Sequence, residues 1–146
     1  MSIRELLAIA LLLPLGTVAM ADPIHAGANG EYWHHESGWV FPKRCGGFER
    51  IGAAQDVAGT RDAVSFYERE WNGLRVIASV HVLARDSAAA DLAPADSADP
   101  QATYVLSSGE WRVRIQLTLP GAASEVAREL DGFVQAQRWE TLGTLH

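Results

Sequence analysis

The fold is decided by residues 64–83, VSFYEREWNGLRVIASVHVL, with Asn72-Gly73 near the middle. Asn and Gly both tolerate the positive φ that a tight type I′ turn requires at its two central residues. Residues of high β propensity lie on both sides of the pair. The sequence therefore predicts a β-hairpin that turns at Asn72-Gly73.

The second arm of this hairpin alternates between apolar and mixed positions. One face carries Leu74, Val76, Ala78, Val80 and Val82. The other face carries Arg75, Ile77, Ser79 and His81. We expect the first set to face the core.

A second hairpin is predicted from Thr103–Ser107 and Trp111–Leu119, with Ser108-Gly109 as the turn pair. Its second arm has the clearest alternation in the chain. Apolar side chains occur at Trp111, Val113, Ile115, Leu117 and Leu119, and between them lie Arg112, Arg114, Gln116 and Thr118. If the two hairpins share one sheet in register, the polar positions form a face partly open to water.

A helix follows the second hairpin. Ser124 is a typical N-cap residue, and Glu125 in the first turn is favoured by the helix dipole. Apolar residues recur at helical spacing through Val126, Leu130, Phe133 and Val134, and Trp139 is expected to close the packing. The predicted class is α+β: an antiparallel β-sheet of two or more hairpins with a C-terminal α-helix packed on one face.

Residues 1–21 have the pattern of a signal peptide: Arg4, an apolar run from Leu6 to Leu15, and the small-x-small site Ala19-Met20-Ala21. The alternative is an uncleaved membrane anchor, but the apolar run is shorter than a spanning helix needs. We expect the protein to be periplasmic or secreted. Residues 22–146 then form a single α+β domain, in which the Ala/Asp/Pro-rich stretch 85–102 is expected to be mobile.

Composition excludes some partners and cross-links. The formal net charge is −6, so the chain lacks the basic surface that nucleic acid or anionic lipid would require. Only one cysteine is present, so no intramolecular disulfide can form. No segment after the signal peptide is long enough to span a membrane.

Three histidines are the candidate metal ligands: His25, His34 and His35. In a strand, His34 and His35 point to opposite sides, so at most two residues of His34-His35-Glu36 can serve one metal. Zinc normally takes three or four protein ligands, and the H-E-x-x-H spacing is absent. The alternative is a pair of surface histidines beside packed aromatic residues. No cofactor is therefore expected, with zinc as the exception to consider.

Cys45 is the candidate reactive thiol. It follows Lys43-Arg44 and precedes two glycines, and both neighbouring cations and an accessible turn favour a thiolate. Catalysis would also need a positioned histidine, which the spacing does not supply. A hydrolase using Cys45 or a carboxylate is therefore the least favoured class. No G-x-S-x-G or phosphate-binding glycine motif is present.

The candidate residues for binding a ligand or partner are aromatic or basic. Trp33 and Trp39 lie in an aromatic N-terminal segment, and exposed aromatic residues dominate protein interfaces. Arg112 and Arg114 share a strand face and, with Arg75, could bind an anion or an acidic partner. The alternatives are that the tryptophans fasten this segment to the sheet and that the arginines are solvated.

Residues 39–42 (WVFP) and 47–50 (GFER), followed by a strand with Tyr67 and the run 76–82, resemble small exported proteobacterial proteins with an FP…GF-x-R opening and no assigned function. The resemblance implies export and a compact β-rich fold. Taken together, the sequence predicts a non-catalytic, exported domain that binds another protein of the cell envelope. The alternative is a metal- or small-ligand-binding protein that uses the His34-His35 segment.

Overall fold

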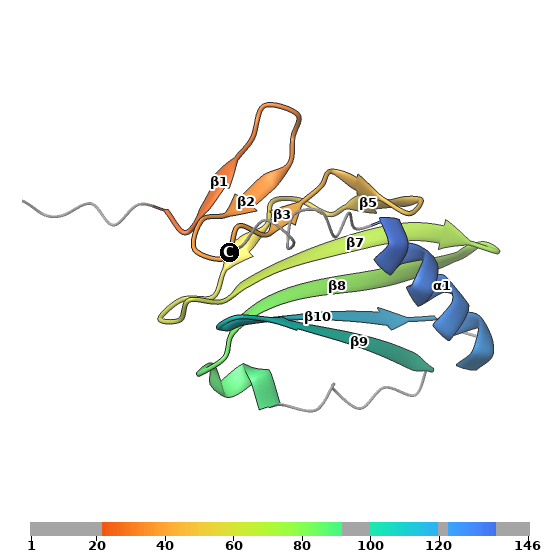
Figure 1. Ribbon diagram of the computed structural model, residues 1–146. Coiled ribbons are helices and arrows are strands. Elements are labelled where there is room, and N and C mark those ends of the chain that lie inside the picture. The colour runs from red at the N-terminus through yellow and green to blue at the C-terminus, as the bar shows by residue number, and fades with distance from the viewer. Residues whose placement is uncertain (1–21, 92–99, 120–122, 137–146) are drawn as a thin grey trace, which may run out of the picture.

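The computed structural model describes residues 22–91, 100–119 and 123–136. These residues form a seven-stranded antiparallel sheet, a three-stranded sheet and one α-helix packed against the larger sheet (Figure 1). The α+β class predicted from the sequence is confirmed. The expected signal peptide, residues 92–99 of the expected mobile stretch and Trp139 lie outside the described residues.

The elements follow one another closely along the chain. The small sheet contains β1 (Ile24–Ala26), β2 (Tyr32–His34) and β3 (Val40–Phe41). The main sheet contains β4 (Arg44–Cys45), β5 (Phe48–Arg50), β6 (Gln55–Asp56), β7 (Ala63–Trp71), β8 (Leu74–Ala84), β9 (Gln101–Ser108) and β10 (Trp111–Thr118). The helices are the 3₁₀-helix η1 (Ala88–Asp91) and the α-helix α1 (Ala123–Ala136).

The predicted hairpin at Asn72-Gly73 is confirmed as β7–β8. Asn72 has φ 49° and Gly73 has φ 74°, so both central residues adopt the left-handed conformation of a type I′ turn. Trp71 pairs with Leu74 across the turn, and the ladder continues without a break to Ala63 and Val82.

The second hairpin, β9–β10, turns one residue later than predicted. Ser108 pairs with Trp111, so the two central residues are Gly109 and Glu110 rather than Ser108-Gly109. Gly109 has φ 57°, and a glycine at the first central position is typical of a type II′ turn. β9 is also longer than predicted, because it begins at Gln101 within the stretch expected to be mobile.

The order of strands in the main sheet is β4-β5-β7-β8-β10-β9, with β6 paired to β7 outside this path. β8 and β9 are each antiparallel to β10, so they run parallel to one another. Two parallel strands require a crossover connection of a dozen or more residues. The topology therefore explains why the connection between β8 and β9 is long.

The start of this crossover lies on the outer face of the sheet, which is the face that carries the polar side chains of β8 and β10. There η1 accepts a hydrogen bond from Arg114. The Nη1 of Arg114 donates to the carbonyl of Ala89 at 3.3 Å. η1 lies within the stretch 85–102 that was expected to be mobile.

The apolar face of β8 and β10 forms the core, as the alternation predicts. Val76, Ala78, Val80, Val82, Val113, Ile115 and Leu117 are all buried. Leu74 is the exception: it is 44 % exposed, because it lies directly beside the turn at the tip of the hairpin. The polar positions from Arg75 to Thr118 share the opposite face, which confirms that the two hairpins are in register.

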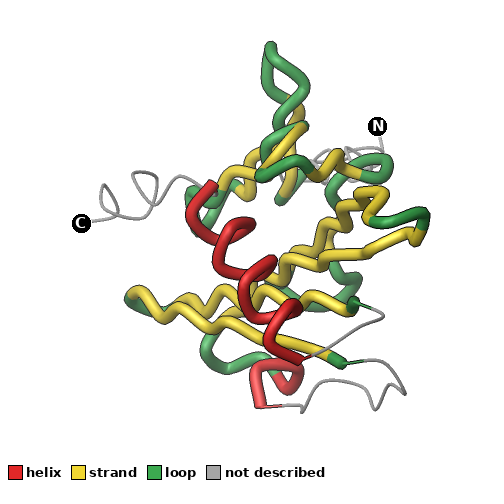
Figure 2. Tube along the Cα trace, turned by 90° about the vertical axis from the view of Figure 1, so that its right-hand side faces the viewer, coloured by secondary structure: helices red, strands yellow, loops and turns green. Residues whose placement is uncertain are grey.

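Helix α1 covers one part of this apolar face, and in Figures 1 and 2 it crosses in front of the strands. Its own side chains Leu130, Phe133 and Val134 are buried against the sheet. The ring of Phe133 lies edge-on to Phe48 at 5.1 Å and to Tyr67 at 5.4 Å between centroids. These contacts join the helix to β5 and β7.

The small sheet packs on the end of the main sheet where β10 begins, and there the ring of His34 contacts Trp111 (Figure 1). Arg50 of β5 holds it in place. Its Nη1 donates to the carbonyl of Phe41 at 2.8 Å, its Nη2 donates to the carbonyl of Gly30 at 2.6 Å, and its guanidinium lies 4.4 Å from the ring centroid of Tyr32. One arginine of the main sheet thus contacts three parts of the small-sheet region.

Candidate functional site

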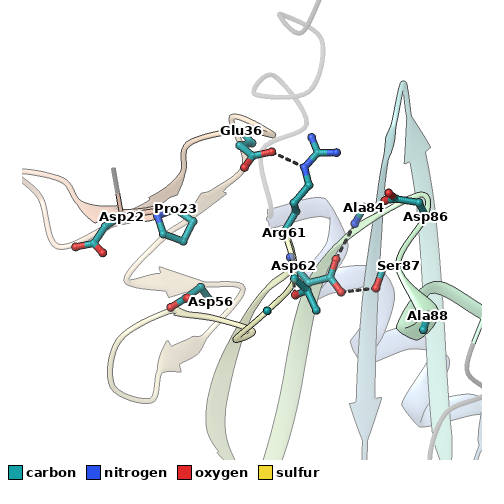
Figure 3. Close-up of a pocket in the computed structure, with 12 residues that line it drawn as sticks. Asp22, Pro23, Glu36, Asp56, Arg61, Asp62, Ala84, Asp86, Ser87 and Ala88 are labelled. Atoms are coloured by element: carbon teal, nitrogen blue, oxygen red, sulfur yellow. Dashed lines mark hydrogen bonds and ion pairs between the residues drawn. The ribbon is translucent and has the colours of Figure 1, made fainter. Parts of the chain in front are cut away.

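A cleft of about 790 Å³ lies between the small sheet, the β6–β7 loop and the start of η1 (Figure 3). Twelve residues line it: Asp22, Pro23, Glu36, Asp56, Gly59, Thr60, Arg61, Asp62, Ala84, Asp86, Ser87 and Ala88. They come from four separate segments of the chain, which the sheet topology brings together.

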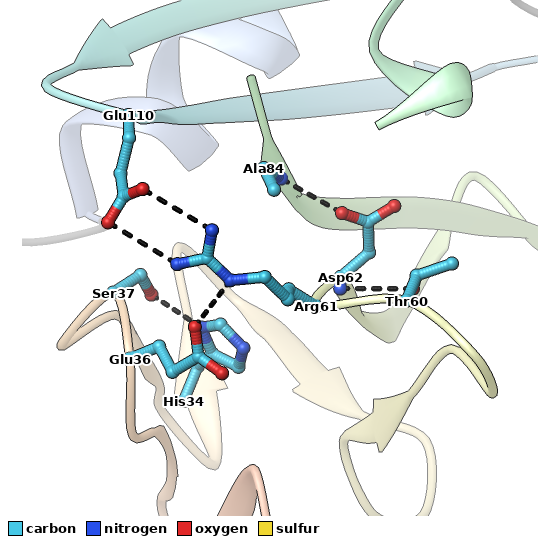
Figure 4. A network of polar contacts seen from close by, with 8 residues as sticks. All are labelled: His34, Glu36, Ser37, Thr60, Arg61, Asp62, Ala84 and Glu110. Atoms are coloured by element: carbon cyan, nitrogen blue, oxygen red, sulfur yellow. Dashed lines mark hydrogen bonds and ion pairs between the residues drawn. The ribbon is translucent and has the colours of Figure 1, made fainter. Parts of the chain in front are cut away.

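Arg61 connects the two sheets at the cleft wall (Figure 4). Its Nε donates to Glu36 at 2.6 Å, and its Nη1 and Nη2 each donate to Glu110 at 3.3 Å. The guanidinium also lies over the ring of Trp111, 4.9 Å from the centroid. Hydrogen bonds from Glu110 and then Glu36 raise the pKa of Arg61 above its ordinary value, so the charge of this side chain is already balanced by two carboxylates.

Asp62, the next residue, has a buried carboxylate that holds the end of β8. One oxygen accepts the backbone N–H of Ala84 at 2.8 Å, and the other accepts the hydroxyl of Ser87. The backbone N–H of Asp62 donates to the hydroxyl oxygen of Thr60 at 3.1 Å. Because both carboxylate oxygens are hydrogen-bonded, Asp62 is a structural support of the cleft floor.

Charge in the cleft is strongly one-sided. Five acidic residues line it, namely Asp22, Glu36, Asp56, Asp62 and Asp86. Arg61 is the single basic residue among the lining residues. The cleft therefore favours a positively charged ligand.

His34 lies behind the cleft wall and is fully buried. Its Nδ1 is 2.7 Å from the hydroxyl of Ser37, and its ring lies edge-on to Trp111 at 5.0 Å. Burial lowers the pKa of His34, which outweighs the opposing effects of Glu36, the Arg61 backbone and Asp62. The surface position expected for this histidine was wrong, because the side of β2 that carries it is the side that docks on the main sheet.

The other two candidate metal ligands lie together on the exposed part of the small sheet. The rings of His25 and His35 are 6.2 Å apart, and neither is buried. His34 points away from them into the core. Among residues 22–91, 100–119 and 123–136, no group of three or more His, Cys, Asp or Glu side chains could hold a metal ion.

The two candidate tryptophans differ in exposure. Trp33 is 36 % exposed and stacks against His25 at 6.5 Å. Trp39 is 2 % exposed and belongs to the hydrophobic core. Trp39 therefore offers no surface to a partner.

The three candidate arginines share the outer sheet face but do not converge. Arg75 forms an ion pair with Glu68 near the β7–β8 turn, whereas Arg114 pairs in register with His81 and donates to η1. Arg75 and His81 are six residues apart on one strand, which is about 20 Å. Arg75 therefore cannot form one anion site with Arg112 and Arg114.

Cys45 is 4 % exposed, which contradicts the accessible turn expected for it. Its thiol donates to the backbone carbonyl of Phe133 at 3.5 Å. The turn that follows it, Gly46-Gly47, packs closely on α1: a Cβ at Gly46 would lie 3.2 Å from the carbonyl oxygen of Gly132. The helix thus covers the thiol.

His81 on the outer sheet face gives a prediction about acid stability. Its pKa is lowered to about 4, first by burial and then by the charge of Arg114, while Asp62 opposes the change. The unfolded chain binds this proton near pH 6.5 and the folded chain only near pH 4. Stability from neutral His81 is therefore complete above pH 6.5 and is lost as pH falls toward 4. We expect this loss to be about 2 kcal/mol for a partly exposed ring.

The measurement is urea unfolding at pH 7 and pH 4.5. On acidification, we expect the free energy of unfolding of His81→Gln to fall by about 2 kcal/mol less than that of the wild type. His25→Gln is the matched control, because it removes an exposed histidine. If the free energy of unfolding falls equally in the wild type and in His81→Gln, the acid-dependent loss does not come from His81.

Arg61 in the cleft wall and Asp62 in the cleft floor are both held by other side chains or by backbone groups. The sequence analysis missed them. The signal was the polar run Gly59-Thr60-Arg61-Asp62 directly before a strand, where an acidic residue can accept backbone N–H groups.

Within the described part of the chain, no helix is long and apolar enough to cross a membrane. Comparisons with protein-family models, with curated proteins and with solved structures find nothing that matches this chain.

Proposed function

We propose that this protein is an exported, non-catalytic domain that binds another protein of the cell envelope, and that the acidic cleft receives a positively charged segment of that partner. The observation that carries the proposal is the charge of the cleft. Five acidic residues and one arginine line a volume of about 790 Å³. Arg61 is paired with Glu36 and with Glu110, so the carboxylates of Asp22, Asp56 and Asp86 leave the cleft with an excess of negative charge.

The size and surroundings of the cleft also support this function. A cavity of this volume can accept two or three extended side chains, and lysine or arginine side chains would pair with the exposed carboxylates. Asp56 and Asp86 are exposed and lie on different sides of the cleft (Figure 3). Trp33, on the small sheet, is a further exposed aromatic side chain that a partner could contact.

The N-terminal sequence supports the proposed export. A charged start, a short apolar run and the Ala19-Met20-Ala21 site support cleavage before Asp22. Asp22 lines the cleft, so cleavage would add one terminal amine there, which offsets one of the five carboxylates and still leaves the cleft negative.

A deca-lysine peptide tests the charge requirement directly. We expect it to bind the protein at low ionic strength and to weaken as salt is added, because screening reduces attraction between exposed charges. Asp56→Asn together with Asp86→Asn should raise the Kd about five- to tenfold at low salt. Isothermal titration calorimetry measures both effects.

The control removes the same amount of charge elsewhere. Glu49→Gln with Glu70→Gln changes two exposed carboxylates of β5 and β7 outside the cleft, so its net charge equals that of the test variant. Its Kd should stay within about twofold of the wild type. Equal weakening by both pairs would show that net charge rather than the cleft attracts the peptide, and the proposal would fail.

A further inference from the structure

β9 is a long strand at one edge of the main sheet as described. Among the described residues, only β10 pairs with it. Its eight residues, QATYVLSS, contain no charge, no proline and no glycine. The opposite edge differs, since β4 has two residues and carries Arg44 with a side chain that is 76 % exposed. Edge strands are normally short or charged because a free edge pairs with other chains.

Successive residues of β9 point their backbone N–H and C=O groups to opposite sides of the strand. Just before the strand, the carbonyl of Pro100 accepts the N–H of Leu119, so even-numbered residues point their backbone groups at β10. The odd-numbered residues therefore point theirs toward the free edge. These are Gln101, Thr103, Val105 and Ser107, and their side chains lie on the exposed outer face.

We propose that β9 pairs with β9 of a second copy of this chain, antiparallel and centred on Val105. In this register Val105 faces Val105 of the other copy, and Thr103 faces Ser107. The free N–H and C=O groups of all three residues are then satisfied. On the inner face, the half-buried Tyr104 and Leu106 come opposite one another and gain apolar contact. The two main sheets become one continuous sheet.

The strand itself favours a second copy over a different extended chain. A two-fold axis through Val105 places hydroxyl beside hydroxyl and apolar beside apolar at every position from Thr103 to Ser107. Val105 is 50 % exposed, the highest value among the exposed large hydrophobic residues that the structure describes. A chain in which 21 % of residues are charged keeps this strand free of charge, which suits an interface between identical strands.

Val105→Lys tests the interface. It places two like charges opposite one another at the axis, and we expect the dimer Kd to rise about tenfold or more. Val57→Lys is the matched control, because Val57 is 41 % exposed and lies in the loop after β6. Sedimentation velocity on the chain from Asp22 onward should give a concentration-dependent dimer for wild type and Val57→Lys, and a monomer for Val105→Lys.

The register has its own test. Across the proposed axis the two Cα atoms at position 105 lie about 5.5 Å apart, within reach of a disulfide. The two atoms at position 103 lie about 13 Å apart. Val105→Cys should therefore form a disulfide-linked dimer on mild oxidation, whereas Thr103→Cys and the wild type, whose Cys45 is buried, should not.

The proposal is overturned if the wild type stays monomeric at several hundred micromolar. It is also overturned if the dimer persists unchanged in Val105→Lys, or if Thr103→Cys cross-links as readily as Val105→Cys. Circular dichroism of each variant identifies any loss of fold, and the cross-linking result does not depend on the lysine substitution. None of these outcomes bears on the acidic cleft, since β9 contributes no residue to it.

Discussion

Phe133→Ala is expected to lower the free energy of unfolding by about 3–5 kcal/mol. The ring is 1 % exposed and packs edge-on against both Phe48 and Tyr67. It is the helix side chain that reaches β5 and β7, so its removal leaves a cavity between the helix and the sheet. Urea unfolding followed by far-UV circular dichroism measures the change.

The control for this variant is Phe66→Ala. Phe66 is an aromatic residue of β7 on the outer face and is 42 % exposed, so its removal leaves no enclosed cavity. We expect the free energy of unfolding of Phe66→Ala to fall by less than about 1 kcal/mol. If the two variants lose equal stability, the helix does not depend on Phe133 for its packing.

The second large effect is expected at Asp62. Asp62→Ala removes the acceptor of the Ala84 N–H, which is buried, and of the Ser87 hydroxyl, which is partly buried. Leaving buried donors unsatisfied should lower the free energy of unfolding by about 2–4 kcal/mol. Amide hydrogen exchange gives a local measurement as well, because the Ala84 N–H should lose protection more than the rest of β8.

Asp86→Ala is the matched control for Asp62→Ala. Asp86 lines the same cleft but is exposed, and its substitution should change stability by less than about 0.5 kcal/mol. An Ala84 N–H that stays fully protected in Asp62→Ala would contradict the role assigned to the carboxylate.

The elements with strong local signals could be predicted from the sequence. Asn72-Gly73 selects one turn type, and the alternation in β8 and β10 identifies the buried face in both strands. The same alternation could not distinguish Ser108-Gly109 from Gly109-Glu110, since a glycine fits either turn. Nothing local marks Leu74 as exposed, because that depends on how far the core extends toward the hairpin tip.

The candidate site depends on long-range contacts, so local sequence patterns predict little of it. Period-2 alternation places His34 and His35 on opposite sides of β2 but does not say which side docks on the main sheet. Likewise, the partners of Arg61 lie 25 and 49 residues away in sequence. The insertion of β10 between β8 and β9 brings Glu110 to this position, and no local pattern encodes that order.

That strand order also has an evolutionary consequence for the crossover from Arg85 to Pro100. The chain must travel the length of β10 and cross two strand spacings, a distance of about 25 Å that roughly eight extended residues can span. The present crossover is about twice that length. Lengthening a loop twofold costs only about 0.6 kcal/mol, whereas a chain too short to span the distance cannot close the sheet. Insertions should therefore be tolerated in this segment during divergence, while large deletions should be selected against.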